Sequence, residues 1–129
     1  MTEKSKILHS LTFPILFLIV IWSIKLIELA IGTQFFFLGI YPLKLQGLLG
    51  IITAPLIHDD IKHLLNNSVP FFILSVAVFY FYRPLGLRVL LLTWLMTGIW
   101  VWCGARQAYH IGASGVVYGL ASLLKRKDN

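Results

Sequence analysis

The feature that most constrains the fold of this chain is a run of apolar residues near its start, from Ile7 to Ile24 and on to Ile31. That length reaches the roughly 20 residues that an α-helix needs to cross a bilayer. Further apolar runs follow along the chain, and no single soluble core in 129 residues could bury so many apolar side chains. We therefore predict an all-α membrane protein, one domain over residues 1–129, whose four transmembrane helices cover about 8–31, 61–82, 88–103 and 113–125.

The composition agrees with a membrane environment. Hydrophobic residues make up 58% of the chain and charged residues 12%, whereas soluble domains carry about 25% charged residues. The net charge of +6 would suggest nucleic acid as the partner of a soluble protein. Here the placement of the basic residues between apolar runs explains it better, so we expect the lipid bilayer and no nucleic acid. The first run is too long for a signal-peptide core, which makes it a retained span.

Two apolar stretches are too short to cross a bilayer. Residues 47–57 contain Pro55 near their end, and we expect them to lie in the interface or to re-enter. The run that begins near Ala113 meets Lys125 after about 18 Å of helix, against a hydrocarbon core of about 30 Å. Either this helix starts inside the membrane, at the floor of a water-filled pocket, or part of the span is missing.

The basic residues predict the orientation of the spans. With both ends in the cytoplasm, the inner face receives Lys4, Lys6, Arg83, Arg88, Lys125, Arg126 and Lys127. The outer side or its edge then holds Lys25, Lys44, Lys62 and Arg106. The positive-inside rule favours this arrangement for a multi-pass integral protein. It also brings a polar set toward one outer face, namely His58, His63, Asn67, His110 and Ser114.

Ser114 lies between small residues, Gly112-Ala113-Ser114-Gly115, at the head of an apolar segment. A serine that opens a helix has free backbone N–H groups beside it, which can bind an oxyanion. Alone, the motif is more typical of close helix packing. His63 and Asn67 change that balance, because residues four apart share one helix face and can present N–H donors together. A buried His–Asn pair could equally join helices inside the membrane.

The other histidines have simpler explanations. His58 is either part of the site or an ordinary interfacial residue, and its spacing from His63 and the neighbouring aspartates matches no zinc pattern. His110 could act as a base only if its loop folded back, so a solvated loop imidazole is favoured. His9 lies on the inner side.

Helix packing is expected at two further positions. Gly115, Gly119 and Ser122 form a small-residue stripe that could contact a helix outside this chain. Tyr118 could stack on an imidazole from such a helix or simply pack. We expect Lys25 and Glu28 to pair and to snorkel toward the headgroups.

The set His58, His63-Leu64-Leu65-Asn66-Asn67 and Gly112-Ala113-Ser114-Gly115, with Tyr118 following, resembles the rhomboid intramembrane serine proteases. The resemblance implies a rhomboid-like bundle in which Ser114 is the nucleophile and His63 and Asn67 bind the oxyanion. His58 would belong to the water-retaining mouth of the cavity, and Tyr118 would pack against the general base. The implied reaction cleaves the transmembrane helix of a protein substrate and needs no cofactor or metal.

Two departures from the rhomboid pattern affect this prediction. Leu49-Gly50 stands where many members carry a Trp-Arg pair. The base of the family is a histidine in the sixth span, and this chain contains only the first four, so the fifth and sixth spans and the base are expected to be missing. We therefore hold two hypotheses: a serine endopeptidase represented by its first four spans, or a rhomboid-like pseudoprotease that binds transmembrane partners without cleaving them.

Overall fold

The computed structural model describes residues 2–128. Its long helices are α1 (Glu3–Ile31), α3 (Ile61–Phe81), α4 (Gly86–Gly104) and α5 (Ser114–Asp128). Between α1 and α3 lie the short helix α2 (Gly50–Thr53) and the 3-10 turns η1 (Phe36–Leu38), η2 (Leu45–Gly47) and η3 (Ala54–Leu56). The only β pairing in the described range is an isolated bridge between Ile40 and His110. The all-α prediction is confirmed.

The helix ends follow from local capping. Thr2 accepts a hydrogen bond from Ser5 N at 3.1 Å, so α1 begins within the polar head of the chain. The same helix ends at Gly32, whose φ of 71° is the left-handed conformation that glycine adopts without strain. The Asp60 carboxylate caps α3 by accepting from His63 N at 2.7 Å. This last cap fixes the first turn of the helix that carries the predicted oxyanion donors.

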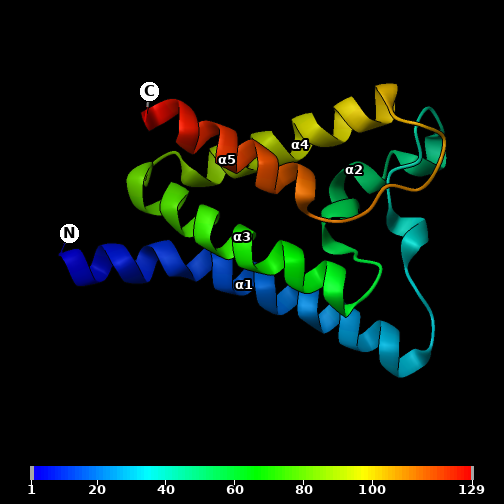
Figure 1. Cartoon of the computed structure of the whole chain (residues 1–129), viewed down its shortest axis with the longest axis horizontal. Helices are drawn as coiled ribbons and strands as arrows, with labels where there is room; N and C mark the ends of the chain where they lie inside the picture. Colours follow the sequence, from blue (N-terminus) through cyan, green and yellow to red (C-terminus); the bar gives the residue numbers. More distant parts are fainter. Residues whose placement is uncertain (1, 129) are drawn as a thin grey trace.

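Figure 1 shows how the helices are arranged. The blue helix α1 lies alongside the green helix α3, and α5 packs on both α3 and α4. The first residues of α1, the turn between α3 and α4, and the last residues of α5 lie at the same end of the bundle. The loops that precede α3 and α5 lie away from this end. Because the predicted inner basic segments belong to the first end, the arrangement is compatible with the expected orientation.

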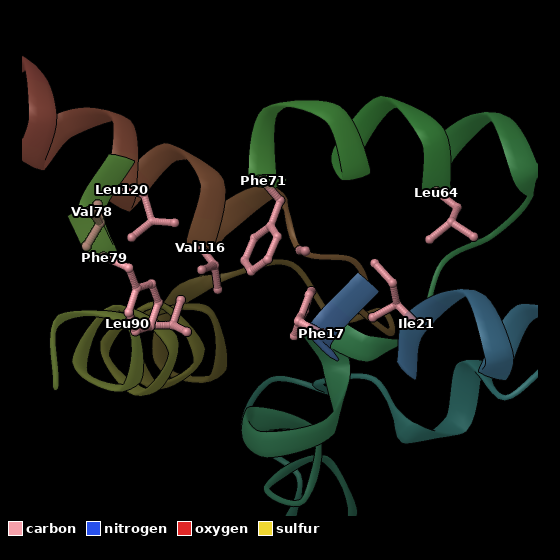
Figure 2. Close-up of a cluster of buried hydrophobic side chains, with 10 residues drawn as sticks. Phe17, Ile21, Leu64, Phe71, Val78, Phe79, Leu90, Val116 and Leu120 are labelled. Carbon is pink, nitrogen blue, oxygen red and sulfur yellow. The ribbon is translucent and has the colours of Figure 1, made fainter. Parts of the chain in front are cut away.

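The apolar core joins four helices, as Figure 2 shows. Phe17 of α1 packs against Phe71 of α3 with tilted rings, whose centroids lie 4.3 Å apart. Leu90 of α4 and Val116 and Leu120 of α5 complete the cluster. Between helices in a membrane, van der Waals packing of such side chains stabilises the contact. This core holds the start of α5 against the middle of α3.

Within the described residues, α1, α3 and α4 are long and apolar enough to cross a membrane. Residues 47–57, which we expected to be too short to cross, lie largely within the apolar stretch Leu45–Leu56, which is broken into η2, α2 and η3. The fourth predicted span corresponds to α5, which starts at Ser114.

The structure corrects two expectations about helix packing. The glycine stripe of α5 is not left for a helix outside the chain, because α4 occupies it. A Cβ added at Gly115 would lie 2.3 Å from Cγ2 of Thr97, and one at Gly119 would lie 2.2 Å from Cγ2 of Thr93. Lys25 and Glu28 do pair, at 3.2 Å, but their side chains are only 3% and 2% exposed. They are buried under the loop before α3 instead of snorkelling outward.

Candidate functional site

Ser114 occupies the first position of α5, where backbone N–H groups lack helical partners. It lines a cavity of about 230 Å³ between α5, α4 and the short helical turns before α3. The walls come from Gly115 and Tyr118 of α5 and from Thr97 and Gly98 of α4. A serine at a helix start beside a cavity has room for an acyl group and donors for its oxyanion.

The predicted oxyanion donors lie against the turn that leads into Ser114. A Cβ built at Gly112 would stand 2.9 Å from Cε1 and 3.0 Å from Nε2 of His63, and 3.6 Å from Nδ2 of Asn67. Gly112 also has a φ of 99°, which side chains rarely tolerate. Glycine is therefore required here for two reasons, and it brings the backbone two residues before Ser114 onto both donors.

The tautomer of His63 follows from its hydrogen bond. Asp59 N–H donates to His63 Nδ1 at 3.3 Å, so Nδ1 is the unprotonated nitrogen. The neutral ring then carries its hydrogen on Nε2, the nitrogen that faces Gly112. This tautomer is the one that can donate a hydrogen bond toward the serine turn.

Asn67 presents an unused donor. The side chain is 7% exposed, and its buried Nδ2 has no hydrogen-bond partner among the described residues. Buried amide groups are normally paired, because leaving one unpaired costs about 1–3 kcal/mol. This Nδ2, which has no partner among the described residues, is available to donate a hydrogen bond to an oxygen atom of a bound ligand.

His58 is buried beside the turn that precedes Ser114. It is 2% exposed, and its Nε2 accepts from Ala113 N at 3.4 Å. Burial, followed by the nearby charges of His63 and Lys25, lowers its pKa from 6.5 to about 4, and the backbone of Leu56 partly opposes the shift. A neutral imidazole is what this acceptor role needs. The hydrogen bond from Ala113 N to His58 and the one from Gly112 N to Ala54 O at 2.9 Å together fix the turn before Ser114.

The remaining candidates lie apart from the donors. His110 Nε2 lies 2.9 Å from Arg106 O, so the ring is engaged within its own loop, although the residue also lines the cavity of Ser114. Tyr118 lines the same cavity and is 74% exposed. His63 and Asn67 approach Gly112 from α3 and are not among the residues that line this cavity. Within the described residues the candidate site therefore has two parts, the pair His63 and Asn67 and the cavity beside Ser114. Gly112 contacts both parts.

Sequence reasoning missed the main-chain groups that position these side chains. The Asp59 N–H and the Ala54 carbonyl act through backbone atoms, which leave no signature in residue type. Asp60 is different, because an Asp directly before an apolar helical run is a typical N-cap. That signal could have predicted where the helix carrying His63 begins.

A comparison with protein families identifies the family of this chain. The Rhomboid domain family matches residues 45–127, which include every candidate residue of the site. This chain belongs to the rhomboid family. With its apolar helices, this membership makes it a multi-pass integral membrane protein.

The rhomboid chain is also similar to several mycobacterial proteins. It is 30% identical over 116 residues to an uncharacterized protein of Mycobacterium bovis, covering 84% of this chain and 48% of that protein. The same figures hold for an uncharacterized protein of Mycobacterium tuberculosis. An uncharacterized protein of Mycobacterium leprae is 28% identical over 92 residues, covering 67% of this chain and 37% of that protein. The chain thus spans about half the length of the M. bovis and M. tuberculosis relatives. No solved structure matches it significantly.

Proposed function

We propose that this rhomboid chain provides the nucleophile and the oxyanion donors of an intramembrane serine endopeptidase. The observation that carries the proposal is the approach of Gly112 to both His63 and Asn67. That contact puts two side-chain donors beside the turn that delivers Ser114. One of them is held in the donating tautomer and the other has an unpaired N–H group.

The proposed reaction begins when Ser114 Oγ attacks a peptide carbonyl in or beside a transmembrane helix of the substrate. A base takes the hydroxyl proton, and the carbonyl oxygen becomes an oxyanion. His63 Nε2–H, Asn67 Nδ2–H and Ser114 N–H donate to it. Collapse breaks the C–N bond, and the base returns the proton to the leaving amine. Water then attacks the acyl-enzyme by the same route, which regenerates Ser114.

The base in this scheme comes from outside the contacts seen here. His58 is bonded to Ala113, His63 to Asp59 and His110 to Arg106 within the described residues. General-base assistance is worth about 10²–10⁴ in rate, so the proposal requires a histidine from another segment or from a second polypeptide.

The test is labelling of Ser114 by a fluorophosphonate probe in membranes from the source cells, where any contributor of the base is present. Ser114→Ala is compared with Ser122→Ala, which removes an exposed serine from the same helix. We expect labelling of the native chain and of Ser122→Ala, and none of Ser114→Ala. Absence of labelling from the native chain, or labelling that persists in Ser114→Ala, would overturn the proposal.

The pseudoprotease is the second candidate, and it predicts capture of transmembrane partners that survives Ser114→Ala. The glycine stripe of α5 gives this candidate no support, because α4 occupies it.

A further inference from the structure

The buried ion pair between Lys25 and Glu28 calls for an explanation. The two side chains are 3% and 2% exposed and lie 3.2 Å apart near the end of α1. Taking two charges out of water costs several kcal/mol per ion, and replacing such a pair by apolar residues is often neutral or stabilising. Stability alone is therefore a weak reason for this pair to be here, and its other contacts point to a different role.

Those contacts run to the loop that precedes α3. Lys25 Nζ donates to Asp59 O at 3.0 Å. Gln34 Nε2 donates to the same oxygen at 3.3 Å. On the other side of the pair, Glu28 Oε2 accepts from Phe35 N at 2.7 Å. The pair thus joins α1, the segment after α1 and the loop before α3 at one point.

Asp59 links this point to both imidazoles of the site. Its N–H donates to His63 Nδ1 at 3.3 Å, and its preceding neighbour His58 accepts from Ala113 N. The two rings lie edge to face with centroids 5.0 Å apart. A rotation of the loop would withdraw the donor from His63 and the acceptor from Ala113 together.

We propose that Lys25 and Glu28 are positioning residues: by anchoring the Asp59 carbonyl from α1, they keep His63 in the Nε2–H tautomer and hold His58 against the serine turn. The proposal rests on the proposed function, since it assigns His63 its role as an oxyanion donor. The tautomer of an imidazole is set by the bond that its other nitrogen makes. Precise donor geometry in turn depends on such supporting contacts.

The measurement is the NMR chemical shifts of the two imidazole nitrogens of His63. The chain is uniformly enriched in ¹⁵N and held in lipid nanodiscs, and the two signals are assigned because they disappear in His63→Gln. The native chain is expected to show a pyridine-like Nδ1 and a pyrrole-like Nε2. A native His63 with averaged nitrogen shifts would overturn the proposal without any variant.

The decisive variant is Lys25→Met with Glu28→Gln. It leaves no unpaired buried charge and keeps an acceptor for Phe35 N, so it is designed to fold. We expect its two His63 shifts to move toward a common value in nanodiscs, and probe labelling of Ser114 in source-cell membranes to fall at least tenfold. The single variant Lys25→Arg retains a donor for Asp59 O. It should keep His63 shifts and Ser114 labelling close to those of the native chain. Lys4→Met, which removes a lysine charge as Lys25→Met does but at the exposed start of α1, should change neither.

A double variant with a native-like amide spectrum and unchanged His63 shifts would overturn the positioning role. The shifts do not depend on activity, which separates the two proposals. If no form of the chain is labelled while the tautomer responds to the double variant, the protease proposal fails and the positioning of His63 stands.

Discussion

The main chain at Gly112 lies against the imidazole of His63, so closely that a Cβ at residue 112 would stand 3.0 Å from Nε2. The same glycine has a φ of 99°. Backbone geometry and the position of the proposed oxyanion donor are therefore coupled at this residue. Any side chain at 112 has to disturb one or both.

Gly112→Ala should lower the free energy of unfolding by about 1–3 kcal/mol, the usual cost of a strained backbone. It should also slow fluorophosphonate labelling of Ser114, because the methyl group displaces His63. Thermal unfolding in nanodiscs and labelling rates measure the two effects. The control is Gly104→Ala, where nothing lies within 4 Å of the added Cβ. Equal effects of the two substitutions would contradict the coupling.

Asn67→Leu separates an oxyanion role from a packing role. The substitution keeps the branched outline of the side chain and removes a buried N–H group that has no partner among the described residues, so stability should change little. Loss of one oxyanion donor should slow cleavage or labelling by about 10²–10³-fold. Asn66→Leu, at the exposed neighbouring position, serves as the control. A destabilised protein with an unchanged rate would instead identify Asn67 as a residue that joins helices.

His58 should make stability depend on pH. Its pKa in the folded protein is lowered to about 4 from 6.5, so the unfolded chain binds the proton more readily. The contribution of neutral His58 is fully present above pH 6.5 and is lost as the pH falls toward 4. His58→Gln, which cannot be protonated, should flatten this part of the profile of unfolding midpoint against pH. His9→Gln, at an exposed position, should leave it intact, and identical profiles for all three proteins would refute the assignment.

The contact between α5 and α4 can be tested with a destabilising substitution in α5 and a compensating one in α4. Gly119→Ala places a methyl group against Cγ2 of Thr93. Overpacking costs about 1–3 kcal/mol, which outweighs the gain in helix propensity of about 1 kcal/mol. The midpoint of thermal unfolding should therefore fall. Adding Thr93→Ser removes Cγ2 and should recover the midpoint. A double variant no better than Gly119→Ala would show that the stripe is not closed by Thr93.

The sequence by itself determined the class of the fold and supplied the residues that we propose for the site. Apolar runs long enough for a bilayer leave helices as the structure that pairs every backbone group, so the all-α prediction depended on no tertiary detail. The spacing of His63 and Asn67 placed them on one helix face for the same local reason. Both inferences follow from the helical repeat, which the sequence carries directly.

Only the tertiary structure decided how these residues are held. His58 and Ala113 are distant in sequence, as are Lys25 and Asp59, and no periodicity predicts that they meet. Tertiary packing buries His58, and it encloses the Lys25–Glu28 pair, which we expected to snorkel. The glycine stripe of α5 contacts Thr93 and Thr97 of α4 because these two helices pack against each other. These contacts join separate elements, and packing between elements fixes them, whereas the pattern within each element does not.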